Sequence, residues 1–267
     1  MSPADRARLE VQGPLELQLQ PLGRRALDAL APQPGERVID VGCGAGSTVA
    51  ALARAVAPGG AVLGVDISEA MLGAAASATA GLEAVRLVCA DAQAYAFQPG
   101  AFDAVFSRFG VMFFADPAAA FGNLRRALRP GGRLAFVCWR SLAENDLDIV
   151  PLRAAAHLLP PLEAEEPDAP GPFAFADEAR VRRVLAAAGF ERIDIAAHDE
   201  RVGSGDLEAM LSVCLRVGGL GKILREAPHL REAAAPPVRA ALAAHDGPGG
   251  VKLKAAVWIV TARAPGG

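Results

Sequence analysis

Short apolar runs alternate with stretches of helical periodicity between residues 37 and 138 of this 267-residue chain. The apolar runs are rich in valine, and several of them lead directly into glycine, aspartate or serine, which is typical of buried parallel strands. A regular alternation of strands and helices favours an α/β domain built on a parallel sheet. The expected strands are 37–41, 61–66, 85–89, 102–106 and 133–138, and the expected helices are 47–56, 68–80 and 117–128.

The chain outside residues 35–140 follows a less regular pattern. Residues 1–34 are interpreted as an N-terminal helical segment, of which residues 1–13 are expected to be loosely held. Residues 141–176 are too long for a plain connection and predict an insertion that acts as a lid or pocket wall. The C-terminal half of the α/β domain, 177–267, is expected to hold a helix at 177–188, strands at 191–202 and 251–262, and a cap insertion of two or three helices at 203–250.

The first expected strand leads directly into a glycine-rich turn, Gly42-Cys43-Gly44-Ala45-Gly46. Glycines at alternate positions permit a sharp turn and let a ligand approach the main chain without a Cβ in the way. The N–H groups at the start of the following helix then face that ligand. Two acids accompany the turn, because Asp40 lies two residues before its first glycine and Asp66 ends the second strand.

This arrangement resembles the cofactor-binding motifs of class I S-adenosylmethionine-dependent methyltransferases, and the resemblance is strong over residues 35–140. The alternative is a nicotinamide-dinucleotide oxidoreductase, whose fingerprint would place a third glycine where this chain has Ser47. Asp40 would be a poor neighbour for the two phosphates of a dinucleotide. S-adenosylmethionine instead carries an ammonium and a sulfonium, which an acid attracts. The spacing therefore favours the methyltransferase.

The resemblance implies a seven-stranded, doubly wound, Rossmann-like α/β sheet with an antiparallel last strand and helical cap insertions. It also implies that Asp66 binds the ribose hydroxyls of the cofactor and that Asp91 accepts a hydrogen bond from the adenine amino group, with the Ala92 N–H meeting a ring nitrogen. The cofactor-binding residues implied for S-adenosylmethionine are Asp40, Gly42, Cys43, Gly44, Gly46, Asp66, Ile67, Met71, Asp91, Ala92 and Ser107.

Charge and composition limit the partners of the protein. The net charge is -3 and the sequence pI is about 5.9, so the chain lacks the basic footprint of a nucleic-acid-binding protein. No apolar run reaches membrane-spanning length, and the first residues lack the apolar core of a signal peptide, so a cytoplasmic protein is expected. The four cysteines have neither C-x-x-C spacing nor a histidine in zinc register, so no metal site is expected.

The sequence determines the methyl acceptor less closely. An acceptor pocket is expected between residues 107–114, Trp139-Arg140 and the two insertions, with Phe109, Met112, Phe113 and Phe114 as apolar lining. These residues favour a small, largely apolar or aromatic acceptor. Arg108 is the candidate for orienting it and His157 is the candidate general base, ahead of His198.

Several alternatives stay open. Within the family the chain most resembles bacterial small-molecule enzymes related to quinone C-methyltransferases, but it lacks their aromatic- and Asn-containing N-terminal signature. A non-methylating protein that binds S-adenosylmethionine for regulation or for a ligand-steered rearrangement is a different kind of function that the same motifs allow. The sequence leaves open the acceptor, the methylated atom and the oligomeric state, for which a homodimer is one option.

Overall fold

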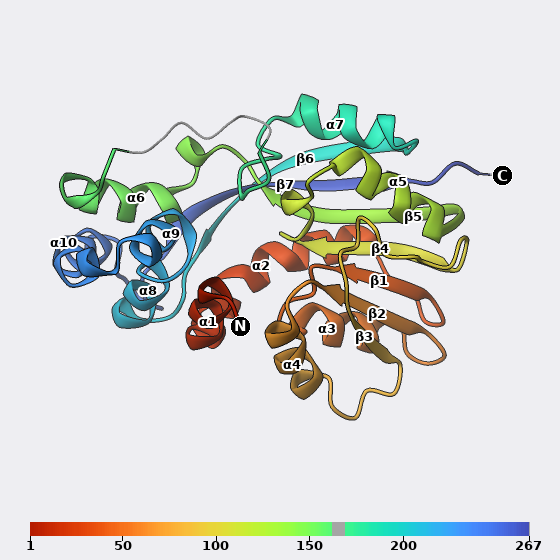
Figure 1. Cartoon of the computed structure of the whole chain (residues 1–267), viewed down its shortest axis with the longest axis horizontal. Helices are drawn as coiled ribbons and strands as arrows, with labels where there is room; N and C mark the ends of the chain where they lie inside the picture. Colours follow the sequence, from red (N-terminus) through yellow and green to blue (C-terminus); the bar gives the residue numbers. More distant parts are fainter. Residues whose placement is uncertain (162–168, 267) are drawn as a thin grey trace. The chain divides into compact units, whose positions relative to one another are not determined.

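A computed structural model describes residues 1–161 and 169–266 of the chain (Figure 1). The described residues divide into two compact units. The sheet unit contains residues 22–140, 169–198 and 257–266, and the helical unit contains residues 1–21, 141–161 and 199–256. Part of the predicted lid, residues 162–168, lies outside the described residues.

The sheet has seven strands in the order β3-β2-β1-β4-β5-β7-β6. Strands β1 to β5 are parallel to one another, whereas β7 runs antiparallel to β5. The predicted fold class is therefore confirmed. The strands are β1 (Arg37–Val41), β2 (Ala61–Asp66), β3 (Val85–Cys89), β4 (Phe102–Arg108), β5 (Leu128–Trp139), β6 (Glu191–Val202) and β7 (Leu253–Arg263).

Helices pack against both faces of the sheet (Figure 1). Strand order reverses between β1 and β4, so right-handed crossovers place the helices on opposite faces before and after this point. Helices α3 (Ser47–Ala55) and α4 (Glu69–Ala78) pack together over β1 to β3. Helices α5 (Pro117–Ala127) and α7 (Glu178–Ala187) pack together on the other side, where Phe121 and Leu185 are fully buried (Figure 1).

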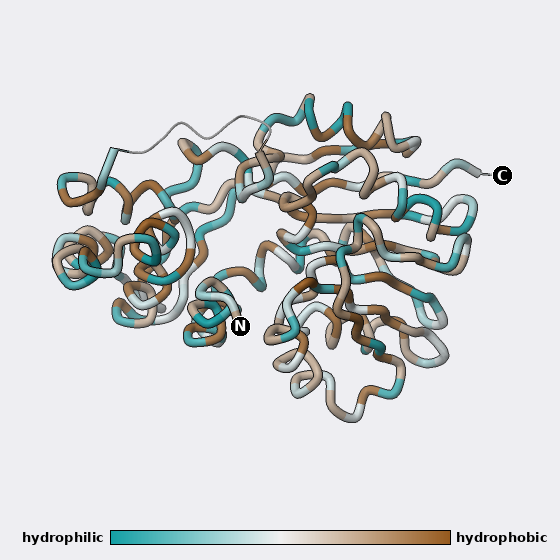
Figure 2. Tube along the Cα trace, in the orientation of Figure 1, coloured by the Kyte–Doolittle hydropathy of each residue, from teal (hydrophilic) through white to brown (hydrophobic). Residues whose placement is uncertain are grey.

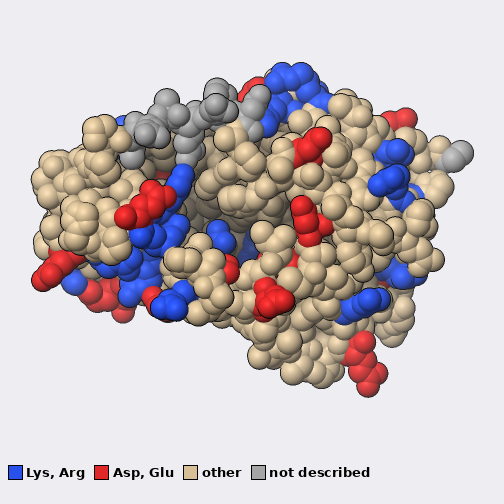
Figure 3. Space-filling model, in the orientation of Figure 1, with Lys and Arg blue, Asp and Glu red and all other residues tan. Residues whose placement is uncertain are grey.

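The sequence explains where these helices begin. Side chains of Ser68, Asp116 and Asp177 accept hydrogen bonds from N–H groups in the first turns of α4, α5 and α7. Apolar residues gather along the central strands of the sheet (Figure 2), whereas basic side chains gather over α7 (Figure 3), which carries Arg180, Arg182 and Arg183. Apolar strands with charged residues on the covering helices are typical of a parallel sheet that is buried on both faces.

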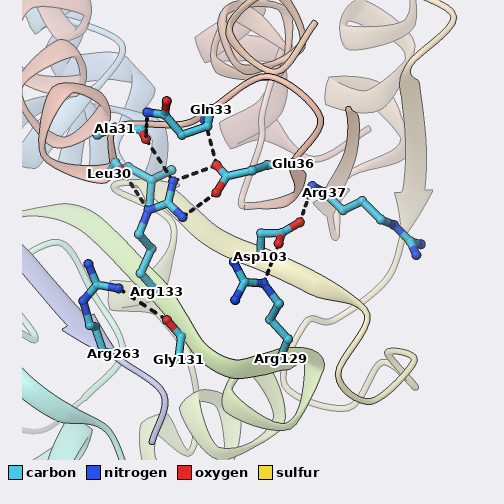
Figure 4. Close-up of polar contacts among 10 residues, drawn as sticks. All are labelled: Leu30, Ala31, Gln33, Glu36, Arg37, Asp103, Arg129, Gly131, Arg133 and Arg263. Carbon is cyan, nitrogen blue, oxygen red and sulfur yellow. Dashed lines mark hydrogen bonds and ion pairs between the residues drawn. The ribbon is translucent and has the colours of Figure 1, made fainter. Parts of the chain in front are cut away.

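An arginine network fixes the edge of the sheet away from the glycine turn (Figure 4). The Arg133 guanidinium donates to both carboxylate oxygens of Glu36, at 2.7 Å each, and to the Leu30 and Ala31 carbonyls at 2.6 and 2.9 Å. These hydrogen bonds from Arg133 lower the pKa of the Glu36 carboxyl. The network ties the end of α2 (Gln12–Leu30) to the starts of β1 and β5.

The helical unit brings together segments that are far apart in sequence. It contains α1 (Pro3–Glu10), the first part of α2, and the helices of both predicted insertions. The Asp148 carboxylate accepts from the Gly219 N–H at 2.7 Å, and Arg216 donates to Glu10 at 3.1 Å. The insertion helices are α6 (Asp146–Ala155), α8 (Leu207–Cys214), α9 (Gly218–Glu226) and α10 (Arg231–Ala243), with short 3-10 turns at Leu142–Glu144, Ala156–Leu158 and Pro228–Leu230.

Two expectations are wrong in detail. Residues 1–13 are helical rather than loosely held, because Ser2 and Asp5 cap α1 reciprocally and Ala7 and Val11 are buried. Strand β5 begins at Leu128 rather than at Arg133, because Leu128 pairs with Phe102 before the register shifts.

Candidate functional site

The glycine turn between β1 and α3 uses the conformational freedom of all three of its glycines. Gly42, Gly44 and Gly46 have φ values of +67°, +53° and +86°, which other residues adopt only with strain. A Cβ on Gly42 would lie 2.7 Å from Gly110 Cα, and a Cβ on Gly46 would lie 2.8 Å from Ala75 Cα. Gly42 and Gly46 are therefore required by packing.

Gly44 differs from the other two glycines. Within the described residues, a Cβ on Gly44 would contact Met71 Cε at 3.5 Å and no other atom within 4 Å. The space above Gly44 is open, which fits close approach of a ligand to the main chain. Met71, a predicted cofactor residue, borders this space.

Asp40 is completely buried beside the turn. Its Oδ2 accepts from Thr48 Oγ1 at 2.5 Å, while Oδ1 has no hydrogen-bond partner among the described residues. Burial raises the pKa of this carboxyl to about 7, against the smaller opposing effects of the Thr48 hydrogen bond and the Arg108 charge. A buried acceptor without a donor costs free energy, so this oxygen is suited to a cationic donor from a ligand.

The Arg108 side chain crosses from the end of β4 toward the same turn. Its Nη2 donates to Ser47 Oγ, in the first turn of α3, at 2.9 Å. Its methylene groups lie against α2, where a Cβ on Gly23 would overlap with Arg108 Cδ. The guanidinium is thus held beside the glycine turn; its predicted role in orienting the acceptor stays a prediction.

Asp66 ends β2 and closes the turn from the other side. Its carboxylate accepts from the Gly44 N–H at 2.8 Å and from the Ser68 N–H at 2.9 Å. Each oxygen keeps a second lone pair for a ligand hydroxyl. The neighbouring Ile67 is 75% exposed, which is unusual for so large an apolar side chain and provides a surface for a flat apolar group.

Asp91 and Ala92 follow β3 at the same edge of the sheet. The Asp91 side chain is exposed and accepts from the Gln93 N–H at 2.8 Å. Ala92 is buried, its carbonyl accepts from Asn123, and among the described residues its N–H has no acceptor. The structure therefore brings an exposed carboxylate and a main-chain donor close together, as an adenine site requires.

Two other predicted cofactor residues have structural contacts. The Ser107 hydroxyl is buried, donates to the Val41 carbonyl at 2.8 Å and accepts from the Gly110 N–H at 3.1 Å. The Cys43 side chain is buried next to Gly64, and its burial raises the pKa of the thiol. Because both side chains are buried, a ligand would contact Ser107 or Cys43 through main-chain atoms.

The aromatic cluster predicted after β4 separates into two groups. Met112 and Phe114 are buried in the core, whereas Phe113 is 46% exposed. Phe109 stacks on Trp139, with ring centroids 4.3 Å apart and an angle of 15° between the planes. Sequence reasoning placed Phe109 and Trp139 in one acceptor pocket but did not predict that their rings stack, although Phe109 directly follows β4 and Trp139 ends the neighbouring β5.

Two further residues named in the sequence analysis are Arg140 and His157. The Arg140 guanidinium lies 5.0 Å from the centre of the Trp258 ring, whose Nε1 donates to the Ala176 carbonyl at 2.9 Å. His157, the predicted base, is exposed in the helical unit. Its catalytic role stays a prediction. Within residues 1–161 and 169–266, no three His, Cys, Asp or Glu side chains gather as metal ligands, and no helix combines the length and apolarity of a membrane span.

Comparison with known proteins agrees with this geometry. A family model described as a methyltransferase domain matches residues 39–136. Nocamycin O-methyltransferase of Saccharothrix syringae is 40% identical over 117 residues, which are 43% of this chain and 42% of that protein. Demethylmenaquinone methyltransferase of Staphylococcus aureus is 38% identical over 109 residues, 41% of this chain and 45% of that protein. These matches span less than half of either relative.

A solved structure extends the likeness of the fold beyond the matched segment. The crystal structure of a SAM-dependent methyltransferase from Aquifex aeolicus aligns over 99% of both chains, with a TM-score of 0.56 and 18% identity, a likeness that shows the fold alone. The fold and the glycine turn define the Rossmann-like class of S-adenosylmethionine-binding proteins. More closely, residues 39–136 belong to the class I S-adenosylmethionine-dependent methyltransferase domain family.

Proposed function

We propose that this chain is an enzyme that transfers the methyl group of S-adenosylmethionine to a small-molecule acceptor. The proposal is supported chiefly by two carboxylates that lie beside the glycine turn, the buried Asp40 of β1 and the half-buried Asp66 of β2. Asp40 offers an unpartnered oxygen to an ammonium, and Asp66 offers lone pairs to a ribose diol. The names of the two curated relatives support a small-molecule acceptor.

The described residues fit the two ends of the cofactor. Asp40 and the open main chain at Gly44 suit its amino-acid end, and Ile67, Asp91 and Ala92 suit its adenine. The Arg108 guanidinium beside Ser47 suits its carboxylate, because an arginine fork binds a carboxylate through two parallel hydrogen bonds. This role differs from the acceptor-orienting role that the sequence predicts for Arg108.

The residues of the turn contribute alignment. When bound, the cofactor supplies an activated methyl group on a sulfonium that is already a good leaving group. Fixing the cofactor at both ends leaves its methyl group with little freedom, and such positioning supplies much of the rate in a displacement of this kind. The sheet unit provides this positioning at the carboxyl ends of β1, β2, β3 and β4, where ligands of open α/β sheets bind.

Calorimetry with S-adenosylmethionine tests the proposal. We expect Asp66→Ala to weaken binding about ten- to a hundredfold, since charge-assisted hydrogen bonds to hydroxyls contribute about 1.5–3 kcal/mol. Asp194→Ala, which removes an exposed carboxylate of β6, is the matched control and should bind as the wild type does. Because Asp66 also holds two main-chain N–H groups, the free energy of unfolding of each variant is measured alongside.

Three results would count against the proposal. Wild-type affinity in the Asp66→Ala variant would show that this carboxylate does not hold the cofactor. Binding of NAD or NADP in place of S-adenosylmethionine would indicate an oxidoreductase. Tight binding without formation of S-adenosylhomocysteine from any acceptor tested would indicate a non-methylating binder.

A further inference from the structure

The turn after β4 sends three successive residues in different directions. The Arg108 side chain contacts Ser47 at the glycine turn, whereas the Phe109 ring lies on Trp139. Gly110 follows with its main chain against Gly42. The turn thereby separates a polar side, which faces the candidate cofactor residues, from an aromatic side.

Phe109 adopts a backbone conformation that phenylalanine rarely takes. Its φ is +59°, in the left-handed region that costs a residue with a Cβ about 1–2 kcal/mol. Its N–H donates to the Val137 carbonyl at 3.1 Å, and the next position requires glycine, because a Cβ on Gly110 would lie 2.5 Å from the Val41 carbonyl oxygen. A large ring therefore occupies a position where glycine would be the easier residue, which points to a use for the ring.

The stack has the geometry of a binding surface. Phe109 and Trp139 both pack against the hydrophobic core, and each is only partly buried, so part of each residue remains accessible to solvent. Their rings are nearly parallel, which favours offset stacking of another planar group rather than packing of a branched aliphatic one. Arg108 pairs with Val137 in the sheet register, so Phe109 directly follows the last residue of β4, and Trp139 is the last residue of β5. This is the edge where the candidate cofactor residues lie.

We propose that Phe109 and Trp139 form the acceptor platform of the enzyme and select a planar, conjugated ring as methyl acceptor. This inference rests on the proposed function. In the reaction, the nucleophilic atom of the ring or of its hydroxyl forms a bond to the methyl carbon while the carbon–sulfur bond breaks. The bonding electron pair goes to sulfur, which leaves as S-adenosylhomocysteine, and the proton of the nucleophile passes to water.

Calorimetry with two matched probes tests the platform. The probes are 1-naphthol, which is planar, and decahydro-1-naphthol, which has the same skeleton without conjugation, each titrated into protein saturated with S-adenosylhomocysteine. We expect the wild type to bind 1-naphthol about three- to tenfold more tightly, which is the added effect of an aromatic pair. Phe109→Leu and Trp139→Leu should each abolish this preference and leave S-adenosylhomocysteine affinity within about twofold of the wild type.

Phe113→Leu is the control, because Phe113 is an exposed phenylalanine of the same turn that is not part of the stack. It should keep the preference for the planar probe. Equal affinity of the wild type for both probes, absence of 1-naphthol binding, or an equal loss in Phe113→Leu would overturn the platform. Failure of S-adenosylhomocysteine to bind the wild type would instead refute the proposed function. The two leucine variants act at different strand ends, so misfolding of one leaves the other to decide.

Discussion

The buried Asp40 carboxyl should make the stability of the protein depend on pH, and Asp40→Asn should remove that dependence. The pKa of Asp40 is about 7 in the fold against an ordinary value of 3.8, chiefly because of burial. That difference corresponds to about 4 kcal/mol between the two protonation states. Asparagine keeps the shape of the side chain and has no charge to bury.

The sign follows from where the proton is bound more tightly. Between pH 3.8 and about 7 the folded state holds a proton on Asp40 that the unfolded state has released, so the free energy of unfolding falls as pH rises through this range. Below pH 3.8 the penalty is absent, and above about pH 7 it is complete. From pH 5 to pH 8 the contribution of Asp40 amounts to a loss of about 2.5 kcal/mol.

Urea unfolding of the ligand-free wild type and of Asp40→Asn, measured at intervals from pH 5 to pH 8, provides the assay. The difference in unfolding free energy between the two proteins should change by about 2.5 kcal/mol across this range in favour of the variant at high pH. Asp194→Asn, at an exposed position of β6, should give a profile parallel to the wild type. Parallel profiles for wild type and Asp40→Asn would refute the reasoning, because the buried carboxylate would then carry no penalty.

Further predictions concern the residues around Asp40. Arg108→Lys keeps the charge but loses the planar fork of the guanidinium, so the affinity for S-adenosylmethionine in calorimetry should fall about tenfold. The kcat at saturating cofactor should stay within about threefold of the wild type. A fall in kcat with unchanged affinity would instead support the acceptor-orienting role. Gly42→Ala should lower the free energy of unfolding by about 3 kcal/mol or more, because Gly42 has a positive φ and an added Cβ would lie 2.7 Å from Gly110 Cα. Gly44→Ala has only the strain of its positive φ and should cost about 1–2 kcal/mol, so equal losses in the two variants would contradict this distinction.

The sequence predicts the parts of the fold that depend on local pattern. Strands β1, β2 and β3 have the predicted bounds, because valine-rich runs between glycines and acids have few other stable arrangements. The positions of Asp40 near the end of β1 and of Asp66 at the end of β2 follow from the same pattern. The structure adds that Asp40 is completely buried.

Features that depend on distant segments are not visible in the local pattern. The sequence pattern predicts residues 1–34 and the two insertions as separate segments. In the structure their helices α1, α6 and α9 belong to one unit, with contacts such as the one between Arg216 and Glu10. Residues 107–114 show the same limit. The spacing of Met112 and Phe114 does not reveal that both are buried while Phe113 is exposed, because the short 3-10 turn at Val111–Phe113 determines their directions.

The turn at Arg108, Phe109 and Gly110 shows why side-chain direction is the hardest feature to predict. The sequence predicts a strand over 102–106, whereas β4 extends to Arg108, and further extended residues would continue the alternation of side chains between the two faces. Two close approaches prevent it: Gly110 lies against Gly42, and the Arg108 stem lies against Gly23 on α2. Gly42 and Gly23 are distant from residue 109 in the sequence, and the turn that they border has a positive φ at Phe109, whose ring stacks on Trp139. The directions of the Arg108 and Phe109 side chains therefore depend on contacts with distant segments of the chain.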